Sequence, residues 1–89
     1  MVLYCRKNKL GHNRLGLTAS VKLGHAVVRN RARRRLREVY RLNEEKFSPG
    51  WDIVVVARSR AVEAPFSALT RSYLNLARKA GILAPEDGQ

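Results

Sequence analysis

The chain has 89 residues, of which 18 are Lys or Arg and 7 are Asp or Glu, so its formal net charge is +11 and its isoelectric point is near 11.1. This length fits one domain with a thin core, because a domain of this size buries only about 60–65% of the surface that its unfolded chain exposes. A deep pocket for a small-molecule substrate is therefore not expected. The charge instead predicts a polyanionic partner, either a nucleic acid or an anionic membrane.

Hydrophobic residues make up 45% of the sequence, which excludes a disordered basic tail. No apolar run reaches the roughly 20 residues of a membrane span, and the first residues lack the pattern of a signal peptide. One cysteine, Cys5, cannot form an internal disulfide, which is typical of the cytoplasm. Two histidines and one cysteine are too few for a zinc site of ordinary spacing. We therefore expect a cytoplasmic protein without a metal site of its own and without a membrane partner.

Two short strands are predicted at the start of the chain. Residues 1–8 alternate in polarity, and residues 15–22 do so more clearly, with an apolar face for the core. Residues 11–13 read Gly-His-Asn, a sequence that favours a turn, so we expect the two strands to pair as a hairpin. The second strand is expected to show a small, polar and basic outer face made of Thr18, Ser20 and Lys22.

A long amphipathic helix is predicted over residues 28–47, where the polarity pattern changes to a helical period. Asn30 is the expected N-cap, and the Ser-Pro-Gly sequence at residues 48–50 ends the helix. The face that should enter the core consists of Ala32, Leu36, Val39, Tyr40 and Phe47. Arginines occupy the remaining faces at three- and four-residue spacing.

The second half of the chain predicts one more strand and one more helix. Residues 51–58 hold an unbroken β-branched run, which indicates a strand covered on both faces, and residues 58–64 are expected to be a loop. Pro65 suits the first turn of the last helix, and Gly81 is its expected C-cap. Its core face is expected to hold Phe66, Leu69, Tyr73, Leu76 and Ala80.

The predicted order of elements is strand, strand, helix, strand, helix, which indicates an α+β fold with helices packed against a sheet. We expect one RNA-binding domain over residues 1–89, in which residues 84–89 form a flexible tail.

The densest basic segment is residues 29–38, where six of the ten residues are arginine. Like charges on neighbouring helical positions repel one another by a few tenths of a kcal/mol per pair, and a bound polyanion would relieve that repulsion. The planar guanidinium can donate two hydrogen bonds to one phosphate and can stack on a base. The N-terminus of the helix adds partial positive charge at the same end. A phosphate backbone is therefore the expected target, and a merely solvated helix face is the alternative.

The stretch from Arg14 to Glu38 contains Arg-x-Gly, Ser-x-Lys-x-Gly and Ala-Val-x-Arg-Asn-Arg, followed by the basic helix. This pattern resembles the signature of bacterial ribonuclease P proteins, and the resemblance extends over nearly the whole chain. It implies a two-layer α/β sandwich of the ribosomal protein S5 domain 2-like fold, with a left-handed βαβ crossover that is rare among proteins. It also implies a non-catalytic subunit, which binds ribonuclease P RNA and the 5′ leader of precursor tRNA. Hydrolysis and the magnesium ions are then expected to belong to the RNA subunit.

The resemblance also assigns RNA-contact candidates, while no catalytic residue is expected on the protein. Ser20 and Lys22 would line the sheet, and Tyr4 could stack on a base of the leader. On the basic helix the candidates are Arg29, Asn30, Arg31, Arg33, Arg34 and Arg37.

Members of the family normally have about one helix and one strand before the position of Met1, and aromatic residues of that helix form a wall of the leader cleft. This sequence begins after that segment, so we expect binding of the RNA subunit to be better preserved than binding of the leader. The alternative function is a structural or ribosomal RNA-binding protein without a role in tRNA processing. A DNA-binding module and a membrane-bound amphipathic helix are less favoured, because the sequence has no helix-turn-helix or dimer signature and has a core for the basic helix to cover.

Overall fold

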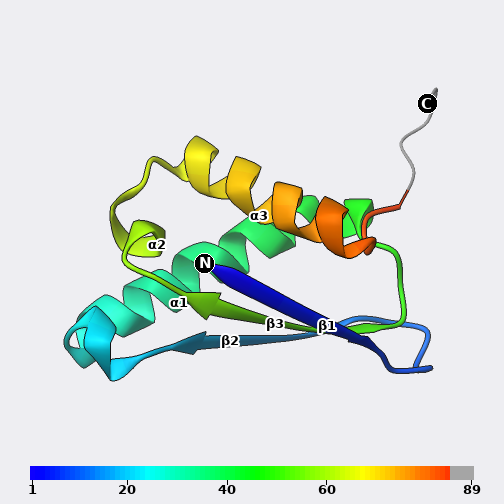
Figure 1. Ribbon diagram of the computed structural model, residues 1–89, viewed down its shortest axis with the longest axis horizontal. Helices are drawn as coiled ribbons and strands as arrows, with labels where there is room; N and C mark the ends of the chain where they lie inside the picture. The colour runs from blue at the N-terminus through cyan, green and yellow to red at the C-terminus, as the bar shows by residue number, and fades with distance from the viewer. Residues whose placement is uncertain (85–89) are drawn as a thin grey trace.

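The computed structural model describes residues 1–84 and has two layers, a three-stranded sheet and a layer of helices (Figure 1). The strands are β1 (Val2–Lys7), β2 (Arg14–Ala19) and β3 (Trp51–Ala57). The order in the sheet is β1-β3-β2, in which β3 runs antiparallel to β1 and parallel to β2. The α+β class predicted from the sequence is confirmed.

The predicted pairing of β1 with β2 is wrong, because β3 lies between them. Backbone and side-chain groups at the two ends of the connecting turn bind the residues where β3 begins instead. The Asn8 backbone N–H donates to the Gly50 carbonyl at 2.9 Å, and the Asn13 Oδ1 accepts the Trp51 backbone N–H at 2.8 Å. The turn is therefore fastened to the third strand, and the two strands that it joins stay one strand apart.

The helical layer contains two long helices and one short one, with 3-10 turns beside the first. These elements are η1 (Val21–Leu23), α1 (Ala26–Asn43), η2 (Glu44–Lys46), α2 (Arg60–Glu63) and α3 (Phe66–Ala80). The helix predicted over residues 28–47 thus begins two residues earlier and ends in a 3-10 turn before Phe47. The four-residue helix α2 lies within the loop predicted for residues 58–64, because so short a helix leaves no periodic pattern in the sequence.

The ends of the helices test the predicted caps. Gly81 is confirmed as the C-cap of α3: it has a left-handed φ of 77°, and its N–H donates to the carbonyls of Ala77 and Arg78. Asn30 is not the N-cap of α1, since His25 holds that position with extended backbone angles and Asn30 lies more than one turn inside the helix.

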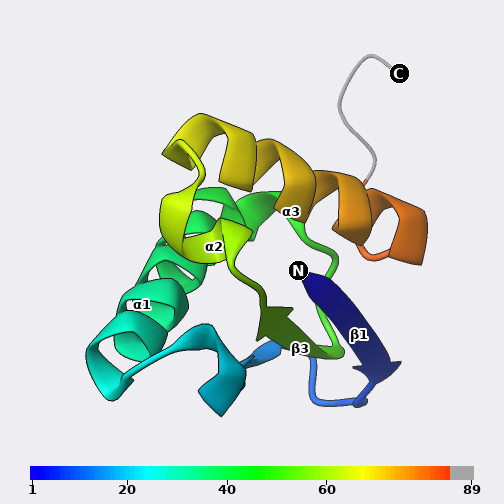
Figure 2. The same cartoon turned by 60° about the vertical axis from the view of Figure 1, so that its left-hand side comes forward.

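One hydrophobic core fills the space between the sheet and the helices. All five positions predicted for the first helical segment are buried, and α3 contributes Leu69, Tyr73 and Ala77. Phe66 and Ala80 of the predicted α3 face are exposed instead. The prediction that β3 is covered on both faces is wrong: Ile53 and Val55 are buried, whereas Val54 between them is 38% exposed. Helices α1 and α3 cover only one side of the sheet (Figure 2).

Near the end of the described chain, the Ala84 backbone N–H donates to the Lys46 carbonyl at 2.7 Å. The first residue of the predicted tail is therefore attached to the domain, and residues 85–89 lie outside the described residues. Among the helices within residues 1–84, none has the length and apolar character that crossing a membrane requires. The handedness of the β2–α1–β3 crossover stays a prediction.

Two leucines of α1 test how the core holds this helix. Leu36 is fully buried and Leu42 is 53% exposed. We expect Leu36→Ala to lower the free energy of unfolding by about 2–5 kcal/mol, because it removes buried methyl groups and leaves a cavity. Leu42→Ala, the control on the same helix, should change it by less than about 1 kcal/mol. Urea denaturation measures both values, and equal losses would contradict the described orientation of α1.

Candidate nucleic-acid interface

Burial of one side of α1 fixes the side that faces solvent. The buried residues recur at helical spacing, so positions on the opposite side are turned away from the sheet. Three exposed arginines on that side have side chains without a hydrogen bond or ion pair to any described residue, so no described residue occupies their donors. These three residues, which we call the arginine face, are Arg31, Arg34 and Arg37.

Other polar side chains of α1 are occupied within the helix. The Arg33 Nη2 donates to the Asn30 Oδ1, three residues earlier. Arg41 donates to the Glu38 carboxylate through Nε at 2.9 Å and also through Nη2. This pairing lowers the pKa of Glu38 and raises that of Arg41. Glu38 is therefore a counter-charge of Arg41.

Arg35 has a structural role that the arginine count alone does not reveal. Its Nη1 donates to the carbonyls of Ala61 at 3.0 Å and Val62 at 2.8 Å, and its Nη2 donates to the carbonyl of Ala64. These carbonyls belong to α2 and the residue that follows it, where a helix end leaves carbonyls without partners. Arg35 thus fastens α2 to α1, and its half-buried guanidinium is already engaged.

The N-terminal end of α1 is open to an anion. Its N-cap, His25, makes no side-chain capping bond, and the first turn carries no acidic residue. Helix N-termini carry partial positive charge from their free N–H groups. Arg29 lies in the second turn, and its buried Nε has no hydrogen-bond partner among the described residues. The predicted Arg29-Asn30-Arg31 triplet thus lies where the charge of the helix end and of the side chains add.

Ser20 and Lys22 do not line the sheet face as predicted, because β2 ends at Ala19. Ser20 is instead the N-cap of η1, where its Oγ accepts the Lys22 backbone N–H at 3.1 Å. Both residues border a shallow hollow of about 170 Å³ together with Arg58 and Ser59 at the end of β3. The Ser20 hydroxyl stabilises a local turn, and this turn ends the strand earlier than the alternating pattern of residues 15–22 predicts.

Tyr4 lies on the side of the sheet that the helices leave uncovered, and its side chain is 62% exposed. In the register of the sheet, Tyr4 pairs with Val54 and Val54 pairs with Gly16, which gives one row across the three strands. We call this uncovered side the open sheet face; besides this row it carries Val2, Val56, Thr18, Arg6, Asp52 and Arg14. An exposed tyrosine on such a surface can stack on a base.

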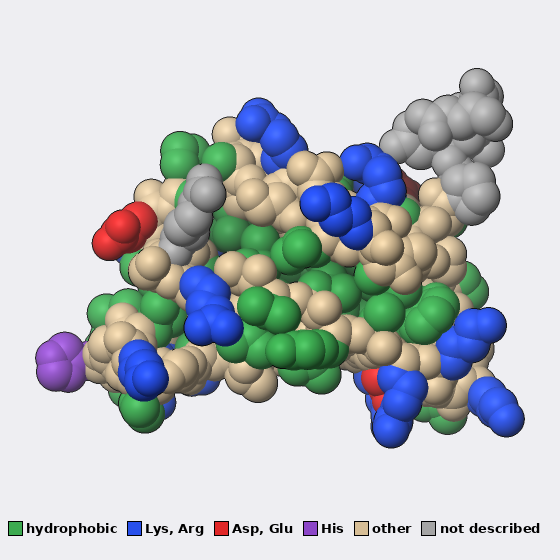
Figure 3. Space-filling view, in the orientation of Figure 1, with side chains coloured by type: hydrophobic (Ala, Val, Ile, Leu, Met, Phe, Trp, Pro, Cys, Tyr) green, Lys and Arg blue, Asp and Glu red, His purple; other side chains and the backbone are tan. Residues whose placement is uncertain are grey.

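The predicted contacts on α1 and at Tyr4 thus fall into two separate regions. Helix α1 packs on the core side of the sheet, and Tyr4 lies on the other side. In Figure 3 Lys and Arg side chains lie at the left and right of the visible side and along its top, around a central area of hydrophobic side chains.

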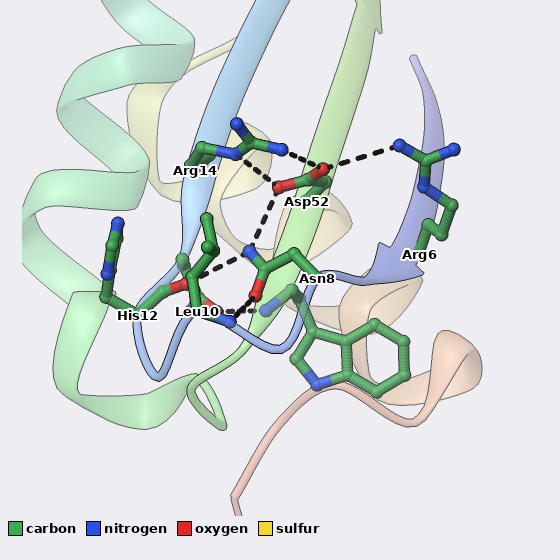
Figure 4. A network of polar contacts seen from close by, with 8 residues as sticks. Arg6, Asn8, Leu10, His12, Arg14 and Asp52 are labelled. Carbon is green, nitrogen blue, oxygen red and sulfur yellow. Dashed lines mark hydrogen bonds and ion pairs between the residues drawn. The ribbon is translucent and has the colours of Figure 1, made fainter.

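A cluster of ion-paired side chains on the open sheet face, at the end of the sheet where β1 meets its turn, was not predicted. Asp52 accepts two hydrogen bonds from Arg14, at 2.7 and 2.6 Å, and lies 3.7 Å from a terminal nitrogen of Arg6 (Figure 4). Arg14 and Asn8 lower the pKa of Asp52 well below its ordinary value. The alternation of β1 puts Arg6 beside Tyr4, but the pairing of three distant segments leaves no mark in the sequence. No group of three His, Cys, Asp or Glu residues that could hold a metal ion occurs in the described part of the chain.

The family model for ribonuclease P matches residues 1–81. The ribonuclease P protein component of Clostridioides difficile is 43% identical over 83 residues, covering 92% of this chain and 73% of the relative. That of Thermoanaerobacter pseudethanolicus is 44% identical over 84 residues, covering 94% and 72%.

Solved structures agree with these sequence matches. The ribonuclease P protein of Staphylococcus aureus superposes with a TM-score of 0.78 at 31% identity, covering 92% of this chain and 75% of that one. The Thermotoga maritima protein gives 0.78 at 33% identity, covering 86% and 74%.

Substitution of Arg35 should lower the stability of the protein, whereas substitution of its neighbour Arg34 should leave stability nearly unchanged. Arg35→Ala leaves buried or half-buried carbonyls of α2 without their donor, and we expect it to lower the free energy of unfolding by about 1–3 kcal/mol. Arg34→Ala removes the same charge from an unpaired exposed position and should change stability by less than about 0.5 kcal/mol. Urea denaturation at fixed salt compares them, and equal losses would refute the structural role of Arg35.

The Asp52 cluster should make stability depend on acid pH. Because the folded-state pKa of Asp52 is lowered, its contribution is present above the unfolded-state pKa of about 3.9 and is lost as pH falls toward the folded-state value. We expect the melting temperature to fall between about pH 4.5 and pH 2, and to fall less in Asp52→Asn. Thermal melts across this range test this expectation, and parallel curves for the two proteins would contradict it.

Proposed function

This chain belongs to the ribonuclease P protein family and has the role of the protein subunit in tRNA 5′ processing, and we propose that its arginine face binds the RNA subunit of that enzyme. The observation that carries the proposal is that the guanidinium donors of Arg31, Arg34 and Arg37, on one helix, make no hydrogen bond to any described residue. Each guanidinium can donate a two-pronged pair of hydrogen bonds to a phosphate. The N-terminus of the same helix adds a further attraction for phosphate.

The helix is a better scaffold for this contact than a mobile basic tail. Its buried side is held by the core, and Arg35 fastens its flank to α2. The arginines therefore approach the RNA with little backbone entropy left to lose. Counterions released from the RNA supply much of the binding free energy, so affinity should fall steeply with salt.

We further propose that the 5′ leader of precursor tRNA lies on the open sheet face, where Tyr4 offers a stacking surface above Val54. Single-stranded RNA is commonly bound in this way, with bases on exposed aromatic rings and phosphates on neighbouring basic side chains. The protein would thus hold two parts of the same complex, one on each of its two basic regions.

In this proposal the RNA subunit and its magnesium ions perform the hydrolysis, and the protein positions the substrate and neutralises phosphate charge. The carboxylates beside the two basic regions support this division, because Glu38 is engaged by Arg41 and Asp52 by Arg14. Oxygen ligands occupied by arginine are poor candidates for holding a catalytic metal. The assembled enzyme would work in the cytoplasm, as the composition suggests.

Cleavage of a precursor tRNA by a bacterial ribonuclease P RNA at limiting magnesium tests the function. We expect this protein to raise the rate of 5′ cleavage, because it supplies charge neutralisation that magnesium otherwise gives. The double variant Arg31→Ala with Arg34→Ala should lose most of that gain, by about tenfold or more, since it removes two phosphate contacts.

The matched control is Arg71→Ala with Lys79→Ala, which removes the same charge from exposed positions on α3. It should retain the gain within about twofold if position rather than net charge matters. If both double variants lose the gain in cleavage rate equally, the proposal that the arginine face binds the RNA subunit is refuted. A folded wild-type protein that binds RNA but gives no gain would favour the structural or ribosomal RNA-binding alternative.

A further inference from the structure

The cluster around Asp52 spans all three strands of the sheet. In the register, Arg6 of β1 faces Asp52 of β3, and Asp52 faces Arg14 of β2. The three side chains therefore form one row across the open sheet face, at the end of the sheet where β1 meets its turn (Figure 4). Strand spacing of about 4.8 Å puts the two arginine backbones roughly 10 Å apart, with the carboxylate between them.

Three hydrogen bonds and one ion pair hold the Asp52 carboxylate. Its Oδ1 accepts from the Arg14 Nε at 2.7 Å and from the Asn8 Nδ2 at 3.0 Å, while its Oδ2 accepts from the Arg14 Nη2 at 2.6 Å. The same Oδ2 lies 3.7 Å from the Arg6 Nη2. Asn8 is itself fixed, because its Oδ1 accepts the Leu10 backbone N–H at 2.8 Å and its Nδ2 also donates to the His12 carbonyl at 3.1 Å.

The arginines, in contrast, keep most of their donors. A guanidinium has five N–H groups, and Asp52 takes two from Arg14 and holds Arg6 only at ion-pair distance. The side chain of Arg14 is 59% exposed and that of Arg6 is 83% exposed. In Figure 4 each guanidinium directs a further nitrogen away from the carboxylate. The cluster keeps a formal charge of +1, from two arginines and one aspartate, and presents oriented donors to solvent.

We propose that Asp52 is a positioning residue that holds Arg14 and Arg6 as a second phosphate-binding site, for single-stranded RNA lying along the open sheet face. The proposal rests on the RNA-binding function given above and adds a site separate from the arginine face. A long arginine side chain loses rotamer entropy when it binds a phosphate, and a carboxylate that already holds it reduces that loss.

The surroundings fit a nucleotide chain at this site. Tyr4 and Val54 lie two residues along their strands from Arg6 and Asp52, a step of roughly 7 Å. A hollow of about 220 Å³ lies there, lined by Tyr4, Cys5, Arg6, Asp52 and Val54. A base on Tyr4 could therefore have its phosphate at the two arginines. The start of β2 is about 17 Å from its end, so the site lies several nucleotides from the N-terminus of α1.

The direction in which one substitution changes RNA affinity shows whether Asp52 positions the arginines or acts only through net charge. Asp52→Asn raises the net charge by one unit, so a protein that attracts RNA only by total charge should bind more tightly. If Asp52 positions Arg14 and Arg6, the same variant should bind more weakly despite its added charge. The matched control is Glu45→Gln, which makes the same change of charge at an exposed carboxylate of η2.

The experiment measures Kd and its salt dependence for three RNAs: a precursor tRNA with its leader, the same tRNA without the leader, and the ribonuclease P RNA. The leader arm is measured on the assembled complex of protein and RNA subunit. We expect Asp52→Asn to weaken binding of one RNA by about three- to tenfold and to reduce its log–log salt slope by about 0.7, the value for one phosphate of a single strand. Arg14→Lys keeps the charge and the carboxylate but loses the two-pronged contact, and should weaken the same RNA.

If only the precursor tRNA with its leader is bound more weakly, the site binds the leader. If only the ribonuclease P RNA is bound more weakly, the site binds that RNA. Tighter or unchanged binding by Asp52→Asn and Arg14→Lys, with wild-type binding intact, would overturn this proposal and leave the proposed function standing. Failure of the wild-type protein to bind any of the three RNAs would instead overturn the proposed function, and this site with it. Circular dichroism and thermal melts at pH 7 establish that each variant is folded.

Discussion

Burial of one side of α1 against the sheet is the contact on which the rest of the surface depends. Ala32, Leu36 and Val39 are completely removed from solvent, and this fixes the rotation of the helix about its axis. Six arginines within ten residues then separate into different environments according to position alone. Arg35 turns toward the carbonyls of α2, Arg33 pairs with Asn30, and the arginine face is left without partners inside the described protein. A small core thus determines which charges on α1 face solvent without a partner among the described residues.

Much of the secondary structure follows from local pattern, and the errors occur where distant segments meet. The period of α1 and its four apolar core positions can be predicted from the sequence because side chains three and four residues apart share a face. The hairpin prediction failed because strand pairing depends on partners far along the chain. Here Asn8 and Asn13 bind the start of β3, and β3 takes the central position. Ser20 similarly left the expected strand because its hydroxyl caps a local turn.

The candidate site shows the same division. Arginine density and the signature residues pointed to α1, and the predicted RNA-contact candidates already included Arg34 without Arg35. The structural role of Arg35 was not visible in the sequence, because its partners are carbonyls of α2, 26 and 27 positions along the chain. The row of Arg6, Asp52 and Arg14 joins residues up to 46 positions apart and becomes visible only through the register of the sheet. Both regions use the same chemistry, in which a neighbour restrains some guanidiniums and leaves others open. Specific recognition of RNA then depends on where the open donors lie, beyond the net charge of +11.

The central claim is that the fold selects particular arginines for RNA. Nuclear magnetic resonance of the arginine side-chain Nε–H groups, recorded while ribonuclease P RNA is added, tests it most directly. The account predicts large shifts or broadening for Arg31, Arg34 and Arg37, and little change for Arg35, whose guanidinium is already bound to the carbonyls of Ala61 and Val62. Equal changes at Arg35 and at Arg71 on α3 would contradict it, because they would mean that the RNA responds to charge wherever it lies.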